Sequence, residues 1–541
     1  MGDTGYRTHP DRGRASEVLT MPIQPPLPPL RRRHLWQASA AGLAWAAVPA
    51  AQAHAPRGPL QIVGPWDIGG LQPAISGHVF TRLQIAETLL GAHDHGQAAP
   101  ALAQRWEVAG DGLTWHFVLR PQARFHDGSP VRADSVVRSL ELARATPAPL
   151  RTAPIRAVEA VGDHTVRIRL SAPYASLPAL LAHSSSLVLA PASYDRLGQV
   201  RSIIGSGPYR IVALAPPISL ETAVFDGYDG PAPAIQRVRY MAASRAETRA
   251  LMAEGGQADL AYGLDPASLQ RLRLRRHLHI AAVTLPRTAV IKLNAGLPAL
   301  QDLRARQALS LCIDRAGIAR AILREPELAA HQLLPPTLPD WHDPTLPPLQ
   351  HDPEAAMRLL RDAGWQRHGD GLRNPQGQVL RLALRTFPDR PELPIIATAL
   401  QAQWREAGIA VEVQIGNSGN IPLGHRDGSL QLGLAARNYA TLPDPTATLA
   451  QDFAPAGGDW GAMGWQHPKV SQHLAELMRG RMSASRAAQL RREVVQVLHT
   501  ELPVIPVAWY RQQVALSRRI SGVSLDPLER SYRLTDMQWT S

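Results

Sequence analysis

Predicted helices and strands alternate along the second half of the chain, and this alternation limits the fold more than any other feature. Helical periodicity marks residues 302–322, 353–363 and 393–407, and strand composition marks residues 379–384 and 409–413. A glycine directly follows each of the last two helices, as expected where a helix ends in a left-handed residue. Strands connected by helices usually form parallel pairs, so the pattern predicts an α/β domain with a largely parallel sheet.

The first part of the chain has a different pattern, with short strands separated by tight turns. Residues 60–63, 115–119 and 165–170 have strand composition, and the last of these segments alternates apolar with polar side chains. Asp127-Gly128 has turn composition, and an amphipathic helix is expected to begin after Arg132.

The composition is that of a globular chain with enough residues for about three domains. Its 541 residues include 57 Lys and Arg, 45 Asp and Glu, and 45% hydrophobic residues. All but two of the basic residues are arginines, and they are scattered among acidic residues rather than clustered. Despite a net charge of +12, this spacing argues against a nucleic-acid-binding surface. A single cysteine, Cys312, excludes intrachain disulfides, cysteine-only zinc sites and dithiol redox motifs.

Residues 1–53 have the composition of a cleavable export signal. Arg31-Arg32-Arg33 precede a short Ala-rich apolar run that ends in Ala51-Gln52-Ala53, a small-x-small cleavage site. We expect cleavage after Ala53, with Met21 as an alternative start of translation. The paired arginines are compatible with a twin-arginine signal as well as with ordinary secretion. The protein is therefore expected in the periplasm, without a lipid anchor, because no cysteine follows the signal directly.

Several separated segments together resemble one family. They are Glu87–Leu90 with Pro100–Ala103, Trp106-Glu107-Val108 and Asp127-Gly128; Gly205-Ser206-Gly207-Pro208-Tyr209; Leu303-Arg304 with Ile313-Asp314-Arg315; His351–Ala356 with Ala363-Gly364-Trp365; and Leu502–Pro506. In order and spacing they are similar to the extracytoplasmic solute-binding proteins that serve peptide and nickel ABC importers, solute-binding protein family 5. The resemblance covers residues 60–541.

The resemblance implies a two-lobed periplasmic binding protein fold, type II and cluster C-like, with a hinge and an extra domain inserted in the first lobe. The implied divisions are residues 54–77 for the first part of lobe 1, 78–204 for the inserted domain, 205–292 for the second part of lobe 1, 293–505 for lobe 2 and 506–541 for the return to lobe 1. A ligand would be enclosed between the lobes when they close at the hinge.

The implied function is that of a receptor and not of an enzyme. Such a receptor captures a peptide-like or metal-chelate ligand and delivers it to the permease subunits of an ABC importer at the membrane. We expect a monomer without a cofactor, a protein-held metal or a nucleic-acid partner. A receptor specific for a nickel chelate is the first alternative, and an extracytoplasmic hydrolase is the second.

The candidate ligand-binding residues lie mainly in residues 437–445. In peptide-binding members a carboxylate three residues before an Asp-Pro pair binds the peptide's ammonium group, and Thr441 has that place here. Nickel-chelate members have an arginine, an aromatic residue and the Asp-Pro pair, which Arg437, Tyr439 and Asp444 match. A neutral threonine offers no charge-assisted hydrogen bond, so we predict weak binding of free amines and better binding of carboxylates.

Three further residues complete the candidate ligand site. Trp465 lies in a Gly-rich loop and could close over a ligand, while His183 and Ser184 occupy a stretch in which nickel-chelate members have arginines. The alternative is structural: Arg437 and Tyr439 would then cap a strand end, and Trp465 would be a half-buried anchor.

Two other strings suggest chemistry but favour turns or backbone roles. His93-Asp94-His95-Gly96 offers two imidazoles without a third ligand, so we predict a hairpin turn rather than a metal site. Gly205-Ser206-Gly207 lacks the first glycine of a nucleophile elbow, so no catalytic residue is predicted. Cys312 lies on an apolar helix face and is expected to be buried and inert.

Overall fold

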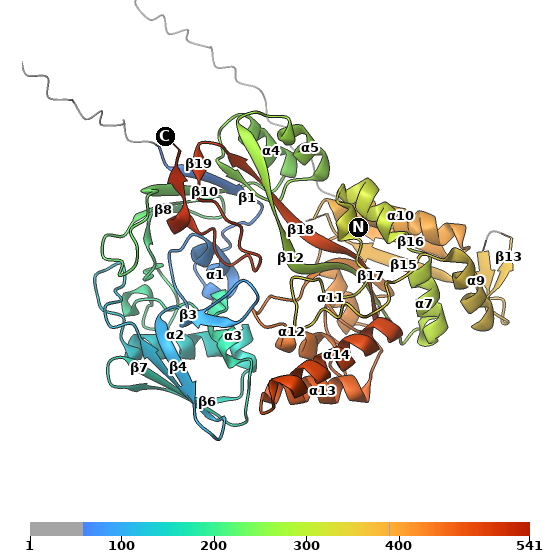
Figure 1. Cartoon of the computed structure of the whole chain (residues 1–541), viewed down its shortest axis with the longest axis horizontal. Helices are drawn as coiled ribbons and strands as arrows, with labels where there is room; N and C mark the ends of the chain where they lie inside the picture. The colour runs from blue at the N-terminus through green and yellow to red at the C-terminus, as the bar shows by residue number, and fades with distance from the viewer. Residues whose placement is uncertain (1–57, 370, 389, 541) are drawn as a thin grey trace, which may run out of the picture. The chain divides into compact units, whose positions relative to one another are not determined.

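The structure is a computed structural model that describes residues 58–540 except 370 and 389. The export signal predicted for residues 1–53 lies outside the described residues. Figure 1 shows that segments from both ends of the described chain, blue and red, come together next to the green strands from its middle.

One ten-stranded sheet forms the centre of the described chain. Hydrogen bonds connect its strands in the order β16-β15-β17-β12-β18-β11-β1-β10-β9-β8. In that order the strands are Ala410–Ile415, Arg381–Thr386, Leu432–Asn438, Leu278–Leu293, Val504–Ser517, Leu260–Ala261, Leu60–Gly64, Arg237–Ala242, Ser219–Val224 and Tyr209–Ala215. By the expected domain divisions, strands β16, β15 and β17 fall in lobe 2, and strands β11, β1, β10, β9 and β8 fall in lobe 1.

The ten-stranded sheet as a whole is mixed, whereas β15, β16 and β17, in the part of the chain for which a largely parallel sheet was expected, are parallel. Strand β15 is parallel to both β16 and β17, and β1 is parallel to both β10 and β11. By contrast, β12 runs antiparallel to both of its neighbours, β17 and β18. Helix–strand alternation reports only the connections between neighbouring segments, whereas β12 pairs with strands that lie far away in the sequence.

Strands β12 and β18 join the two lobes. Residues 278–285 of β12 pair with residues 510–517 of β18, next to β11 in lobe 1. Residues 288–293 pair with β17 in lobe 2 as well as with the first part of β18. The register shifts between Leu285 and Thr288, where the strands pass from one lobe to the other (Figure 1). Because such a bulge lets a strand pair bend, this position is suited to a hinge.

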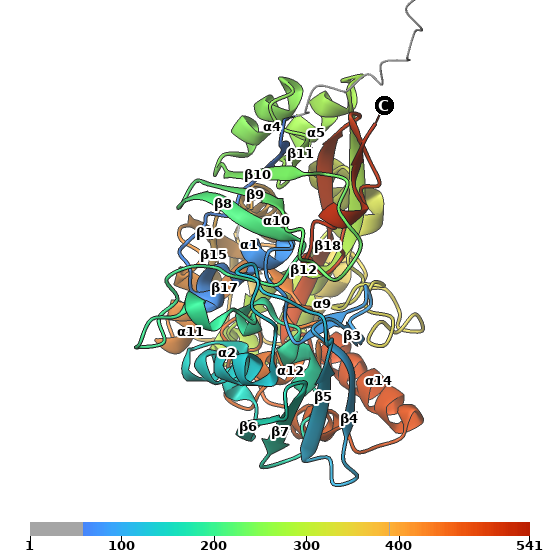
Figure 2. The same ribbon diagram turned by 90° about the vertical axis from the view of Figure 1, so that its left-hand side faces the viewer.

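A separate antiparallel sheet lies in the region expected to be the inserted domain. Its order is β4-β5-β7-β6, with bounds Ala103–Val108, Thr114–Leu119, Thr165–Leu170 and Ile155–Val161. Helix α2 (Ala133–Ala145) packs on it, and the buried apolar cluster comes from residues 89–190 together with Leu442 of lobe 2. In Figure 2 this sheet lies at the bottom of the view, while α4 and α5 lie at the top.

Three two-stranded pairs complete the strands of the described residues. They are β2–β3 (Leu90–Ala92, Ala98–Pro100), β13–β14 (Gln366–His368, Gly371–Arg373) and β19–β20 (Ile520–Ser521, Gln538–Trp539).

The remaining helices cover the sheets, and their ends have local causes. They are α1 Pro73–Arg82, α3 Leu177–Leu181, α4 Ala246–Glu254, α5 Pro266–Arg273, α6 Pro298–Gln301, α7 Leu303–Leu311, α8 Arg315–Ile318, α9 Pro353–Asp362, α10 Glu392–Glu406, α11 Asn420–Arg426, α12 Thr446–Asp452, α13 Pro468–Arg479 and α14 Ala484–Glu501. The Asp352 carboxylate caps α9 by accepting from the Ala355 N–H at 2.8 Å. Gly480, with φ +68°, ends α13. None of the helices in residues 58–540 combines the length and the apolar character that crossing a membrane requires.

The helix expected over residues 302–322 is interrupted, which corrects that prediction. Helix α7 ends at Leu311, and the Asp314 carboxylate accepts from the Gly317 N–H at 2.7 Å, which caps a new short helix, α8. An aspartate favours such a cap over the interior of a helix because its side chain competes for backbone N–H groups.

The predicted domain boundaries stay a prediction, although separate apolar clusters occur in lobe 1, in the 89–190 region and in lobe 2.

Candidate functional site

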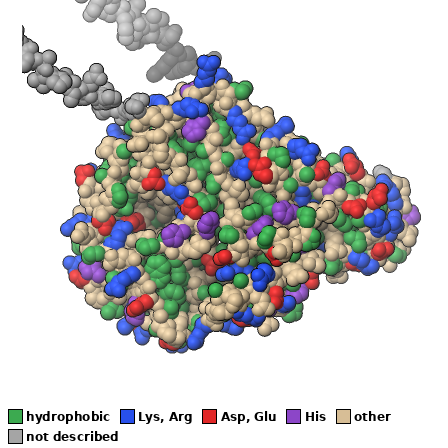
Figure 3. All heavy atoms as spheres, viewed as in Figure 1, with side chains coloured by type: hydrophobic (Ala, Val, Ile, Leu, Met, Phe, Trp, Pro, Cys, Tyr) green, Lys and Arg blue, Asp and Glu red, His purple; other side chains and the backbone are tan. Residues whose placement is uncertain are grey.

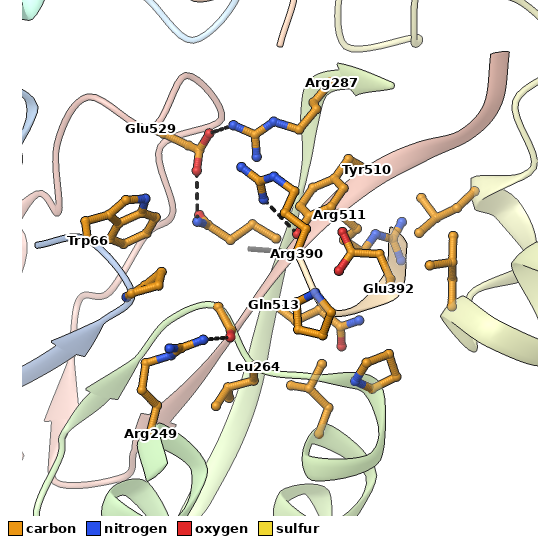
Figure 4. A pocket seen from close by; sticks show the side chains of 18 of the residues that line it. Trp66, Arg249, Leu264, Arg287, Arg390, Glu392, Tyr510, Arg511, Gln513 and Glu529 are labelled. Atoms are coloured by element: carbon orange, nitrogen blue, oxygen red, sulfur yellow. Dashed lines mark hydrogen bonds and ion pairs between the residues drawn. The ribbon is translucent and has the colours of Figure 1, made fainter. Parts of the chain in front are cut away.

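Two adjacent pockets lie between the lobes. Their volumes are about 580 and 990 Å³, which is the size range of sites for small solutes. Three residues line both pockets: His78 of α1, Arg287 of β12, and Glu529 of the C-terminal segment. The smaller pocket, shown in Figure 4, lies at the crossing of β12 and β18 and is closed on one side by the start of α10.

Two arginines stack on one tyrosine in the smaller pocket. The guanidinium carbons of Arg287 and Arg390 lie 5.1 and 5.0 Å from the centre of the Tyr510 ring. Nη1 of Arg390 also donates a hydrogen bond of 3.0 Å to the Tyr510 hydroxyl. Figure 4 shows the two guanidinium groups on the same side of the pocket, beside this ring. Stacking orients a guanidinium and leaves N–H groups in its plane that can bind a carboxylate.

Glu529 contacts the arginines from the other side of the pocket. Its carboxylate forms an ion pair with Arg287 and accepts from Gln512 Nε2 at 3.2 Å. Arg82 donates to the Glu529 backbone carbonyl at 2.8 Å, and its guanidinium lies 4.0 Å above the Trp66 ring. Nη1 of Arg82 and Nε of Arg287 are buried and have no hydrogen-bond partner among the described residues. The cluster therefore has more donors than it uses internally.

The electrostatic balance of this arginine cluster (Arg82, Arg287 and Arg390) is positive. Burial tends to raise the pKa of Glu529, but Arg287, Arg82 and Arg390 together outweigh burial and lower that pKa. Burial and the neighbouring Arg390 lower the pKa of Arg287, as expected for like charges held close together. A second carboxylate, Glu392, also lines the smaller pocket. Asp67 lines this pocket as well, but no ion pair joins it or Glu392 to the cluster among the described residues. Within the cluster three guanidiniums share the single carboxylate of Glu529, and this excess favours an anionic group.

Two other arginines line the same pocket but have their own partners. Arg249 is buried and donates to the carbonyls of residues 243, 244, 262 and 263, so it holds loops together. Arg511 forms ion pairs with Glu325 at 2.8 Å and with Glu327 at 2.5 Å. Neither arginine changes the charge balance near Tyr510.

The larger pocket contains two of the predicted residues, His183 and Ser184, together with Thr441. Nδ1 of His183 accepts from the Ser185 N–H at 3.1 Å. Burial lowers the pKa of His183 to about 4, so its imidazole is neutral near pH 7. The Thr441 hydroxyl donates to the Asn438 carbonyl at 3.1 Å. The structure thus brings these three side chains to one cavity.

Arg437 lies in a different environment from the one that the sequence suggested. It forms two hydrogen bonds with the Asp452 carboxylate, at 2.6 and 2.7 Å, and the Asp452 side chain is 2% exposed. Lys292 is buried beside this pair and donates to the carbonyls of Gly458 and Gly461 at 2.6 Å. Arg437 lines neither pocket between the lobes. Its guanidinium neutralises a buried carboxylate inside lobe 2, because an unpaired Asp452 would be strongly destabilising there.

Tyr439 and Trp465 are core residues, in line with the structural alternative. They are 1% and 6% exposed and belong to the same apolar cluster of lobe 2. Trp465 Nε1 donates to Glu501 at 2.7 Å. Asp444 accepts from the Thr446 N–H and hydroxyl at 2.9 and 2.8 Å, which is how α12 begins, and it lines a separate pocket of about 250 Å³.

The short sequence motifs that were considered as possible metal or catalytic sites have structural roles. Residues 93–97 form the turn of the β2–β3 hairpin, with Gly96 at φ +90°, as predicted. A Cβ atom on Gly205 or Gly207 would come within 2.2 Å of a backbone carbonyl, so these glycines allow two chain segments to approach closely. Cys312 is 2% exposed, and burial raises its pKa to about 12, as expected of an inert thiol. No group of three or more His, Cys, Asp or Glu side chains in residues 58–540 is arranged to hold a metal ion.

A family comparison agrees with this architecture. The model of the bacterial extracellular solute-binding proteins, family 5, matches residues 97–460. This chain belongs to that family. Its members are binding proteins, so this solute-binding protein is a receptor rather than an enzyme.

Individual relatives cover nearly the whole solute-binding protein. The nickel-binding periplasmic protein of Escherichia coli K12 is 25% identical over 484 residues, which are 86% of this chain and 91% of the relative. The dipeptide-binding protein of the same organism is 24% identical over 469 residues, 81% of this chain and 85% of the relative. The crystal structure of NikA from Brucella suis with Fe(III)-EDTA has a TM-score of 0.80 at 22% identity, covering 90% of this chain and all of that one. The two-lobed fold is therefore that of family 5 binding proteins.

Sequence reasoning missed the arginine cluster of this solute-binding protein. Arg287 lies in a segment for which the sequence analysis predicted no helix or strand, and Arg390 follows β15 by only a few residues. The signals were present: a charged residue inside a buried strand, and an Arg-Pro-Glu string just before a helix. Neither signal indicates which cavity a side chain lines, because β12, β18 and the C-terminal segment meet only in the folded chain.

Proposed function

We propose that this protein is the periplasmic receptor of an ABC importer, and that it captures a small solute carrying a carboxylate between its two lobes. The observation that carries the proposal is the arginine cluster, in which two donors are buried without partners. Arg287 and Arg390 line the pocket of about 580 Å³, and Arg82 and Arg287 line the pocket of about 990 Å³. A buried donor without a partner is destabilising, so a ligand that accepts its hydrogen bond should be bound strongly.

The proposal includes the setting in which the receptor works. It is exported, possesses a cleavable signal of the ordinary or twin-arginine type, acts as a monomer and delivers its solute to permease subunits at the membrane. Basic and acidic side chains are intermixed on the face shown in Figure 3, which gives no support to a nucleic-acid partner. The nickel-binding periplasmic relative named above supports the location.

The solute is peptide-like or a related small molecule. The two pockets together offer more than 1,000 Å³ of space, more than a single amino acid needs. A relative that binds dipeptides and a relative that binds nickel both align with most of the chain. The relatives therefore do not discriminate between a peptide and a nickel compound as the ligand.

A metal chelate is the second candidate, and one observation favours it. The imidazoles of His78 and His183 both line the larger pocket, and burial lowers the pKa of each to about 4. Neutral imidazoles are good ligands for nickel and similar ions. A chelator could bind the arginines through its carboxylates while its metal contacts these rings.

Calorimetry on the exported form of the protein tests the proposal. The probes are dipeptides, nickel citrate and a nickel–histidine complex, and the variant is Arg390→Gln. If the cluster binds the ligand's carboxylate, the variant should weaken binding about 10- to 100-fold, the effect of losing a charge-assisted hydrogen bond. Arg304→Gln, which removes an exposed ion pair with Asp302 and changes no residue of either pocket, is the control and should leave the affinity unchanged. Equal affinity of the Arg390→Gln variant would contradict the proposal.

A further inference from the structure

Glu392 is a buried carboxylate whose hydrogen bonds are incomplete. It is the first residue of α10 and is 8% exposed. Its Oε1 atom is buried and has no hydrogen-bond partner among the described residues, although the side chain lines the smaller pocket. Figure 4 shows its carboxylate beside Tyr510 and Arg390, on the opposite side of Arg390 from Glu529.

The neighbouring cations do not complete the hydrogen bonds of Glu392. Arg390 donates to the Tyr510 hydroxyl, Arg287 pairs with Glu529, and Arg511 pairs with Glu325 and Glu327. These charges attract Glu392 at a distance, and the N-terminus of α10 also favours an acidic residue in its first turn. Burial nevertheless dominates and raises the pKa of Glu392, although its own backbone N–H and the Tyr510 hydroxyl act in the opposite direction. These two donors still leave Oε1 without a partner among the described residues.

An acidic residue placed in this way stabilises the fold poorly. A shorter or apolar side chain at the start of α10 would avoid the free-energy penalty of burying an unpaired carboxylate oxygen. The Glu392 side chain lines a cavity that a solute can enter, so a donor on the solute would remove the penalty. An ammonium or another N–H group fits because it donates and because a positive charge complements the carboxylate.

We infer that Glu392 determines specificity by binding a cationic or N–H donor group of the solute, next to the arginines that bind its carboxylate. The inference rests on the proposed function and narrows its ligand class to zwitterionic solutes. Glu392 thus provides the negative charge that Thr441 does not provide. The two residues line different pockets, so the donor group binds at the smaller pocket and not at Thr441.

Paired ligands test this role in the full exported protein. The probes are alanyl-alanine, glycyl-glutamate and histidyl-glutamate, each with a free amine and as the N-acetyl derivative, measured by calorimetry at pH 7.5. The wild-type protein should bind the free amines more tightly than the acetylated peptides by about 10- to 100-fold. Glu392→Gln should reduce this ratio to near one by weakening the free amines alone. Glu406→Gln, at the exposed other end of α10, should leave the ratio unchanged.

Four results would overturn the inference, and they separate it from the proposed function. Equal wild-type affinity for free and acetylated peptides, or a preference that survives in Glu392→Gln, removes the role of Glu392 while the receptor function stands. If the protein binds only nickel chelates, and Glu392→Gln does not change their affinity, Glu392 likewise has no role in specificity while the receptor function stands. If neither peptides nor chelates bind the wild-type protein, the proposed function fails and the inference fails with it. Thermal unfolding of Glu392→Gln shows whether a lost affinity reflects the site or the fold.

Discussion

At the scale of single residues, buried charges in this protein either have complete sets of partners or face a cavity. Asp452 and Arg437 form a bidentate pair, and Lys292 has backbone carbonyls as acceptors. Glu392 and Arg287 retain atoms without partners, and both line the pocket between the lobes. The complete network of Arg437, Asp452 and Lys292 thus has a structural role, whereas the incomplete ones of Glu392 and Arg287 lie where a ligand can complete them.

Replacing Arg437 should affect stability more than ligand binding. Arg437→Met leaves the buried Asp452 carboxylate unpaired, so the free energy of unfolding should fall by about 3–5 kcal/mol. The double variant Arg437→Met with Asp452→Leu should recover most of the loss, because no charge then remains unpaired. Urea denaturation measures both changes.

The matched control is the exposed pair Arg426–Asp459, whose side chains are 57% and 41% exposed. Arg426→Met should change the free energy of unfolding by less than about 1 kcal/mol. If Arg437→Met instead leaves stability intact and abolishes ligand binding, Arg437 is a ligand-binding residue after all.

His126 should make the protein less stable in acid. Its Nε2 hydrogen-bonds the Gly207 carbonyl at 3.0 Å, and burial lowers its pKa to about 4 from an ordinary value of 6.5. Between pH 6.5 and 4 the unfolded chain binds a proton that the folded chain does not, so stability falls as the pH drops through this window. At pH 5.5 the loss is about 1 kcal/mol.

Denaturation at pH 7.5 and at pH 5.5 tests this. His126→Asn should unfold with a smaller difference between the two pH values than the wild-type protein, whatever its absolute stability. His164→Asn, at an exposed histidine, should keep the wild-type difference. An unchanged pH dependence in His126→Asn would assign the acid sensitivity to other groups, such as His78 and His183, whose pKa values burial also lowers to about 4.

At the scale of elements, the loop before α12 connects lobe 2 with the inserted domain. Leu442 is 6% exposed and lies in the apolar cluster formed by residues 89–190. The β2–β3 turn touches the same loop, since a Cβ on Gly96 would lie 2.2 Å from the Pro443 carbonyl oxygen. A backbone hydrogen bond of 2.7 Å from the Ala175 N–H to the Met478 carbonyl adds a second connection, at the end of α13. These contacts lie across the cleft from the hinge strands.

Shortening Leu442 should therefore favour opening of the cleft. Leu442→Ala removes apolar contacts that exist only when lobe 2 meets the inserted domain, so the ligand-free protein should have a larger radius of gyration in solution scattering. A Leu→Ala change at a fully buried site costs about 2–5 kcal/mol, but opening should relieve part of that loss here. Leu140→Ala, inside the same cluster but within the inserted domain, should lower stability without changing the radius of gyration. If Leu442→Ala instead lowers stability and leaves the radius of gyration unchanged, the loop is a fixed part of the inserted domain.

At the scale of the whole molecule, two strands connect lobes whose facing surfaces hold the pockets. The register shift between Leu285 and Thr288 lies next to Arg287, so the proposed hinge and the arginine cluster are neighbours in the sequence. Bending at this position would separate Arg390 of lobe 2 from Glu529 of the C-terminal segment. A ligand bound between them would thus hold the lobes together.

A true ligand should close the molecule and stabilise it. Solution scattering should show a smaller radius of gyration in the presence of the ligand. Because the ligand binds only the folded state, stability should rise by about 2.7 kcal/mol at a ligand concentration 100 times Kd. Thermal unfolding over a series of ligand concentrations measures that rise. Tight binding with an unchanged scattering profile would contradict closure at the hinge.

The sequence by itself determined the family-level architecture and many local elements. Strand and helix patterns placed β1, β5, β7, α9 and α10 within a few residues of their observed bounds, because capping residues and periodicity act locally. The turns at Gly96 and Gly128 were also predictable, since a positive φ favours glycine.

Only the tertiary structure decided which charged side chains face the ligand and which belong to the core. Arg437 matched a family pattern, yet Asp452, fifteen residues later, binds it inside lobe 2. Arg287, Arg390 and Glu529 come from three distant segments, and no spacing along the chain predicts their meeting. The direction of β12 was decided in the same way, by partners from elsewhere in the sequence. The physical reason is that pairing and burial depend on contacts between distant residues, whereas sequence patterns report the conformation of neighbours.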